Sequence, residues 1–130
     1  MIRTHILRIF NTLLLLLISF SCQEDRLSQE QEEQQLESLF DEIQEMANSK
    51  DCENASNWTY TAYVEKACGG PVGYLAYSTL IDTACFLDKV DEHRTAQQEF
   101  NEKWGIGSDC SVPEEPNDVI CDEGDPAFVY

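Results

Sequence analysis

Cysteine is the residue type in this 130-residue chain whose spacing suggests chemistry most directly. Cys22 directly follows an apolar run and a small residue, where its thiol could be acylated. Five more cysteines follow at positions 52, 68, 85, 110 and 121. In an oxidising compartment such cysteines form disulfides. Because five is an odd number, at most two bridges form and one thiol is left over.

Four of these cysteines are the disulfide candidates: Cys52, Cys68, Cys110 and Cys121. Nearness in the sequence suggests a Cys52–Cys68 bridge, while Cys110 could pair with either Cys68 or Cys121, and the sequence does not fix the choice. Cys85 falls inside a predicted helix. We expect it to be the free, buried thiol, because an unpaired cysteine behaves as a small hydrophobic residue.

The first 21 residues have the three zones of a secretory signal peptide. Arg3 and Arg8 make a basic start, Leu13–Phe20 is apolar except for one serine, and Ser21 is a small residue before the cut. The apolar run is shorter than the roughly 20 residues that a membrane-spanning helix needs. The sequence therefore predicts a signal peptide over residues 1–21 and a mature chain that begins at Cys22.

Leu17–Cys22 resembles a relaxed bacterial lipobox, and the following Gln23-Glu24-Asp25 resembles the acidic stretch of surface lipoproteins of the Bacteroidetes. The resemblance implies lipidation of Cys22, with diacylglycerol on the thiol and a further acyl chain, such as palmitate, on the new amino group. Two or more acyl chains anchor a protein stably. We therefore expect a membrane partner through Cys22, at the outer membrane or the cell surface. Simple secretion after an ordinary cut before Cys22 is the alternative.

Charge excludes one class of function. Removing residues 1–21 removes two of the eight basic residues and no acid, which leaves 6 − 25 = −19 for the mature chain. Nucleic-acid binding needs clustered Lys and Arg, so we expect no nucleic-acid partner. The acidity either keeps the protein soluble or attracts a basic protein partner.

Catalytic and metal-binding patterns are sparse. His93 is the only histidine after residue 21, which excludes a multi-histidine metal site, and we expect it on an exposed helix face. Ser108–Ser111 lacks the Gly-x-Ser-x-Gly pattern of a hydrolase elbow. An acidic loop around Gly124 offers oxygen ligands for calcium at spacings that do not match an EF-hand. Its acids are Asp118, Asp122, Glu123 and Asp125. We expect no catalytic residue, metal or cofactor.

Two helices dominate the expected elements. Residues 22–35 are polar and acidic and read as a tether or a frayed helix start. Apolar residues then recur at helical spacing, which predicts a helix over about 30–48. A second helix is expected to start at Pro71, or at Thr79 with residues 72–77 extended, and to end at Trp104, with Gly105 as its C-terminal cap.

The remaining segments are less regular. Trp58–Thr61 alternates as a short strand would, and residues 105–130 form a Gly- and Pro-rich coil in which 127–130 could add a final strand. We therefore predict a mainly α fold: one small domain over residues 36–130, with two antiparallel amphipathic helices and disulfide-tied coil. One or two short strands are possible within it.

Four motifs in residues 58–124 resemble a group of short exported proteins of the Bacteroidetes. They are Cys68-Gly69-Gly70-Pro71, Tyr74–Ser78, Ser108-Asp109-Cys110 and Cys121-x-x-Gly124. The group's pattern ends in a further cysteine where this chain has Pro126, which would account for the odd number of cysteines. The resemblance supports a shared fold and implies no activity.

These observations favour a lipid-anchored envelope protein with a non-enzymatic binding or structural role. The alternative is an acidic inhibitor or binding module for a basic secreted enzyme, such as a lysozyme. A thiol-redox enzyme is a third class, and it would need a reactive cysteine of low pKa.

Overall fold

The computed structural model describes residues 26–130, so the predicted signal peptide and the lipidation site Cys22 lie outside the described residues. Two α-helices, one 3₁₀ turn and four strands follow in order. They are α2 (Gln29–Ala47), η2 (Ala55–Asn57), β1 (Trp58–Glu65), β2 (Pro71–Ser78), α3 (Thr83–Trp104), β3 (Asp118–Asp122) and β4 (Asp125–Val129).

The prediction of a mainly α fold is wrong. The strands form two antiparallel hairpins, β1–β2 and β3–β4, beside the two helices. The first hairpin includes Pro71, which opens a strand rather than a helix, and pairs Trp58 with Ser78 at its far end. Its aromatic and β-branched residues favour strands. Pairing between distant segments is not visible in local periodicity, so the apolar spacing around Tyr77 was misread as helical.

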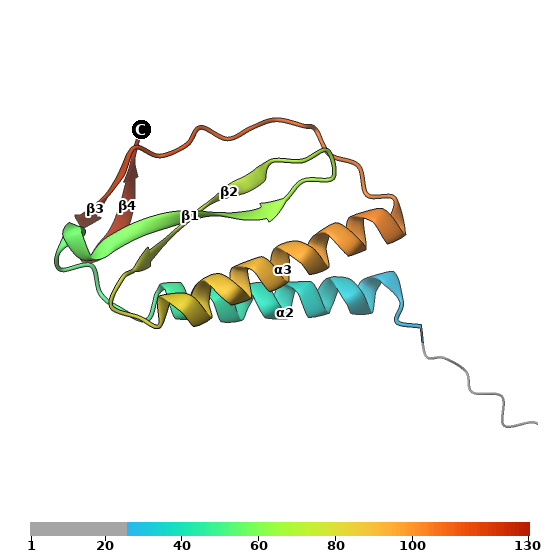
Figure 1. Ribbon diagram of the computed structural model, residues 1–130, viewed down its shortest axis with the longest axis horizontal. Coiled ribbons are helices and arrows are strands. Elements are labelled where there is room, and N and C mark those ends of the chain that lie inside the picture. The colour runs from blue at the N-terminus through green and yellow to red at the C-terminus, as the bar shows by residue number, and fades with distance from the viewer. Residues whose placement is uncertain (1–25) are drawn as a thin grey trace, which may run out of the picture.

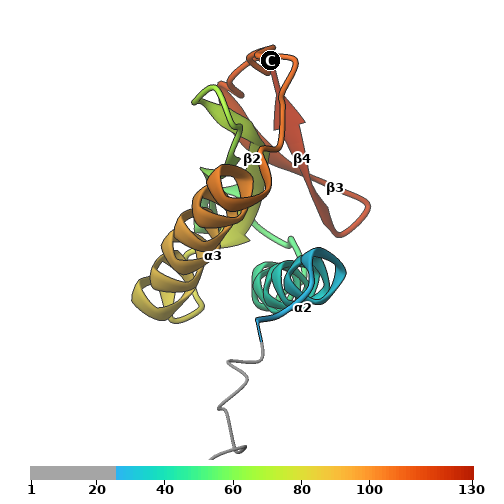
Figure 2. The ribbon, with the colours of Figure 1, turned by 90° about the vertical axis from the view of Figure 1, so that its right-hand side faces the viewer.

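The β1–β2 hairpin is the middle layer of the fold. The antiparallel helices lie on one side of it, and the β3–β4 hairpin and the coil from Gly105 lie on the other (Figures 1 and 2). Because side chains alternate along a strand, the two faces of the β1–β2 hairpin pack against different neighbours. Tyr63, Leu75 and Tyr77 pack into the helix cluster. Trp58 and Ala76 pack into a second cluster with Val119 of β3.

α2 begins and ends close to the predicted helix over about 30–48. Ser28 accepts from the Gln31 N–H, and the Gln31 side chain accepts from the Ser28 N–H, which completes a capping box. Leu36, Ile43 and Ala47 are buried along its inner face. The last seven residues of the predicted tether, 29–35, lie within this helix.

α3 starts later than expected. Asp82, three residues after Thr79, is the N-cap and accepts from the Cys85 N–H. The helix then runs unbroken for 22 residues. The predicted glycine cap is confirmed: Gly105 has φ 63° and donates to the Asn101 carbonyl.

Two disulfides tie the layers together, which confirms that disulfides are present. Cys52 pairs with Cys121, and Cys68 pairs with Cys110. The Cys52–Cys68 bridge suggested by sequence proximity is therefore wrong, because the hairpins bring Cys52 beside β3 and the β1–β2 turn beside the coil. Cys85 is free, but it is exposed and not buried as predicted.

Within residues 26–130, neither helix is apolar enough over a sufficient length to span a membrane.

Candidate functional site

Two grooves lie where α2 begins and α3 ends. Leu36 of α2 and Phe100 of α3 line both of them, so the two grooves adjoin at these residues. The first two turns of α2 contain no apolar residue, and nothing there can fill the space between the diverging helices. The grooves differ in whether their polar side chains form hydrogen bonds and ion pairs with other residues.

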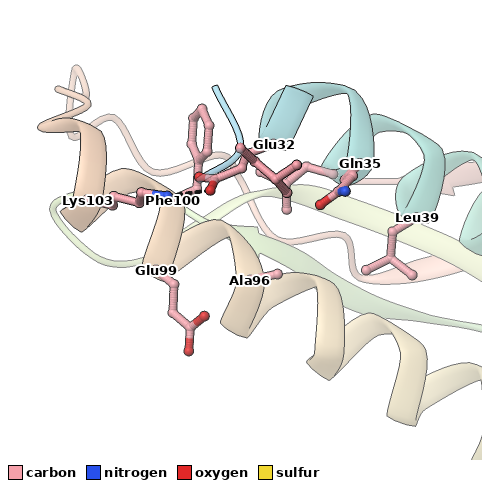
Figure 3. A pocket seen from close by; sticks show the side chains of 9 residues that line it. Glu32, Gln35, Leu39, Ala96, Glu99, Phe100 and Lys103 are labelled. Atoms are coloured by element: carbon pink, nitrogen blue, oxygen red, sulfur yellow. Dashed lines mark hydrogen bonds and ion pairs between the residues drawn. The ribbon is translucent and has the colours of Figure 1, made fainter. Parts of the chain in front are cut away.

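The first, here called the Glu32 groove, has a volume of about 370 Å³. Figure 3 shows Gln35 and Leu39 of α2 facing Ala96 of α3 across it, with Glu99 pointing away from α2. Glu32 closes one end: its carboxylate accepts a hydrogen bond from Trp104 Nε1 at 2.7 Å and pairs with Lys103. Both bonds lower the pKa of Glu32, and the bond from Lys103 has the larger effect.

The second, here called the His93 groove, has a volume of about 490 Å³. It shares Leu36 and Phe100 with the Glu32 groove and also reaches Val64 near the end of β1. Apolar and aromatic side chains form its floor, and polar and acidic side chains of the first turns of α2 form its rim. The floor is Leu36, Phe40, Val64 and Phe100, and the rim is Glu30, Glu33, Gln34 and Glu37, with His93 and Gln97 at the α3 wall.

His93 is only 4% exposed, so the expectation of an exposed histidine is wrong. The ring packs against Phe40, with 5.4 Å between ring centroids. Desolvation lowers its pKa, and the Leu36 backbone carbonyl, which accepts a hydrogen bond from the ring, opposes the shift. The ring is therefore held mainly in its neutral form at pH 7.

The second ring nitrogen of His93 has no protein partner among the described residues. No fully buried side-chain nitrogen or oxygen there lacks a hydrogen bond, so this nitrogen is open to the groove that His93 lines. A neutral imidazole with one N–H engaged offers a lone pair on the other nitrogen. The His93 groove thus contains an available acceptor next to three carboxylates.

The groove floor is held from the sheet side. Tyr63 stacks on Phe40, with ring centroids 5.1 Å apart. The same ring covers Gly73 on the neighbouring strand, where an added Cβ would lie 2.9 Å from Tyr63 Cε1. Val64 has φ 54°, a left-handed conformation that is a true outlier for a β-branched residue. Such strain persists only where the surroundings enforce it, so this wall of the groove is tightly constrained.

A second polar cluster lies where the β1–β2 turn meets the C-terminal coil and consists of Lys66, Asp109 and Ser111. It does not have the properties of a catalytic site. Lys66 Nζ donates to Asp109 Oδ1 at 2.9 Å and to the Ser111 carbonyl and hydroxyl oxygens at 2.7 Å each. The bond from Lys66, followed by bonds from Ser111, lowers the Asp109 pKa to about 2. A fully donating ammonium has no lone pair with which to activate Ser111. The cluster fastens the coil to the turn beside Cys68–Cys110.

The remaining sequence candidates are dispersed. Glu123 and Gly124 form the tight β3–β4 turn, with φ 51° and 98°, as type I′ hairpins require. Residues 26–130 contain no group of three or more His, Cys, Asp or Glu side chains able to hold a metal ion. Cys85 lies alone on α3. The His93 groove was missed because its lining comes from three elements, although the single histidine was a usable signal.

Compared with known proteins, the chain matches no family model, no curated protein and no solved structure.

Proposed function

We propose that the protein is exported and fixed to a membrane of the cell envelope by acyl groups on Cys22, and that it acts there as a non-enzymatic binding or structural protein. The observation that supports export best is the pair of disulfides, which join residues 69 and 42 positions apart. Such bonds form and persist in oxidising compartments outside the cytoplasm. The lipobox-like segment before Cys22 then supplies the anchor.

A binding role is supported by the grooves. The first described helix starts seven residues after Cys22, so a compact domain follows the anchor closely. It presents an aromatic-floored groove whose carboxylates make no ion pair with any residue of the described range 26–130. Lys66, whose ammonium lies 2.7 Å from the Ser111 hydroxyl, is fully engaged in holding the coil. An outer-membrane or cell-surface position fits the acidic stretch after Cys22.

The anchor is tested by replacing Cys22 with serine in the full-length chain. The Cys22→Ser variant is expected in the medium or the periplasm, without incorporated palmitate, while the natural chain sediments with the envelope. Cys85→Ser is the matched control, because it removes the other unpaired thiol and leaves the anchor. Sedimentation of Cys22→Ser with the envelope would contradict the proposal.

A second candidate function is an acidic inhibitor or binding module for a basic secreted enzyme. It is favoured by the ion pairs: within residues 26–130 only four acidic side chains have a basic partner, namely Glu42, Asp91, Asp109 and Glu32. Capture of lysozyme on the immobilised mature protein tests this function. Capture that weakens sharply as salt passes roughly 0.15 M, where the Debye length is about 8 Å, would support it. No capture at low salt would eliminate lysozyme as a target.

A further inference from the structure

We propose that the His93 groove binds an arginine side chain presented by a basic partner protein. This inference rests on the binding role proposed above and names the site and the chemistry of the partner. It is drawn from the combination of an apolar floor, an acidic rim and an acceptor nitrogen that is open to the groove.

The shape of the groove suits a side chain that is apolar along its stem and cationic at its tip. Phe40, Val64 and Phe100 offer apolar surface against which a three-carbon stem could lie. The aromatic rings also favour a cation near their faces, and a guanidinium stacks better than an ammonium.

The rim matches the tip of such a side chain. Glu30, Glu33 and Glu37 line the mouth of the groove, and none of them forms an ion pair with another described residue. Glu33 and Glu37 are four residues apart on α2, and like charges at this spacing destabilise a helix. A bound cation would relieve that repulsion.

The open nitrogen of His93 offers an independent acceptor to a donor that enters the groove. A guanidinium has five N–H groups in a planar fork, so it could donate to His93 and to a rim carboxylate together. The Glu32 groove offers no such set, because Glu32 is already bound to Lys103 and Trp104, Glu99 points away from α2, and no histidine lines it.

NMR of the purified mature protein tests the inference, since His93 is the only histidine after residue 21 and gives a single imidazole C2–H signal. The sample is kept in non-ionic detergent if it carries lipid. The probe is N-acetyl-arginine methylamide, with the citrulline analogue as its neutral isostere. Arginine is expected to shift the His93 signal saturably, and citrulline to bind at least about tenfold more weakly, a difference of about 1.4 kcal/mol.

Two charge-matched double variants locate the site. Glu33→Gln with Glu37→Gln removes two rim charges and should weaken arginine binding about tenfold. Asp88→Asn with Glu102→Gln removes two charges from exposed positions of α3 outside both grooves and should weaken it less than about twofold. The first pair keeps the fold, because it removes like-charge repulsion.

Three results would overturn the inference: no shift of the His93 signal with arginine, equal binding of citrulline, or equal weakening by both double variants. The outcome is independent of the anchor. A mature chain that lacks lipid would refute the proposed attachment at Cys22 and leave the groove test intact, whereas a failed titration would leave the attachment untouched.

Discussion

The two ends of the helix pair use their side chains differently. Where α2 ends and α3 begins, a cluster of five buried residues fills the space: Ile43, Ala47, Tyr77, Phe86 and Val90. Where α2 begins and α3 ends, this cluster does not continue, and two grooves open that are both lined by Leu36 and Phe100. We call these the packed end and the open end.

The difference has a cause in the sequence. Residues 29–35 are all glutamine or glutamate, so the first two turns of α2 have no apolar side chain to bury. The partner turns of α3 then leave Phe100 and His93 facing grooves. The packed end thus contains the buried apolar cluster of the helix pair, whereas the open end is available for binding.

The largest expected effect is at the packed end. Phe86→Ala empties a fully buried site and should lower the free energy of unfolding by about 3–5 kcal/mol. Phe100→Ala, which borders two grooves where water already enters, should cost about 2–3 kcal/mol. Urea unfolding followed by circular dichroism measures both. Equal losses would show that the two ends are packed alike.

The next largest difference is expected between the losses of stability on removing each of the two disulfides. Cys52→Ala with Cys121→Ala should cost about 2–5 kcal/mol, because it opens a closed loop and leaves a space in the second buried cluster. Cys68→Ala with Cys110→Ala should cost less, since both cysteines are exposed and Lys66 still fastens the coil. Thermal unfolding ranks the two variants. A larger loss from the exposed pair would contradict the comparison.

A smaller effect is expected from the floor of the His93 groove. Gly73→Ala places a Cβ against the Tyr63 ring, which cannot move freely because it stacks on Phe40. The expected loss is about 1–3 kcal/mol. Adding Tyr63→Val, which removes the ring, should recover part of it. An unchanged unfolding midpoint for Gly73→Ala would show that Tyr63 is loosely held.

The smallest effect is a pH dependence. The His93 pKa is lower in the folded chain than its ordinary 6.5, so the unfolded state takes up the proton more readily. The stability that neutral His93 contributes is therefore present above pH 6.5 and is lost as the pH falls below it. Glu30, Glu33 and Glu37 also line the groove, and their negative charges oppose this loss because they favour a protonated ring. His93→Gln should lack this step.

A second step is expected at lower pH. The Asp109 pKa falls from 3.8 to about 2 in the folded chain, so its contribution is present above pH 3.8 and is lost towards pH 2. Asp109→Asn removes this step. Unfolding curves between pH 2 and pH 8 reveal both steps. The result that would contradict the His93 assignment is an unfolding midpoint that rises on acidification through pH 6.5 in the natural chain but not in His93→Gln.

Local signals predicted part of the fold. Apolar spacing gave α2, Gly105 gave the end of α3, and the count of cysteines gave the disulfides. The β1–β2 hairpin was predicted only in part, because Pro71 also suits a helix start and the partner strand lies beyond a five-residue turn. The Cys68–Cys110 bridge was one of the two alternatives for Cys110, whereas Cys52–Cys121 depends on how β3 packs, so sequence proximity failed for Cys52. The His93 groove depends on the same tertiary arrangement.

The proposed anchoring and the two disulfides depend on where the chain is processed and in which compartment it folds. Intact-mass analysis of the natural protein purified from its cells, with and without reductant, tests both together. We predict a chain that begins at Cys22, has the added mass of its acyl groups, and gains four hydrogens on reduction of its two disulfides. An unmodified chain that still begins at Met1 and does not change mass with reductant would contradict the account.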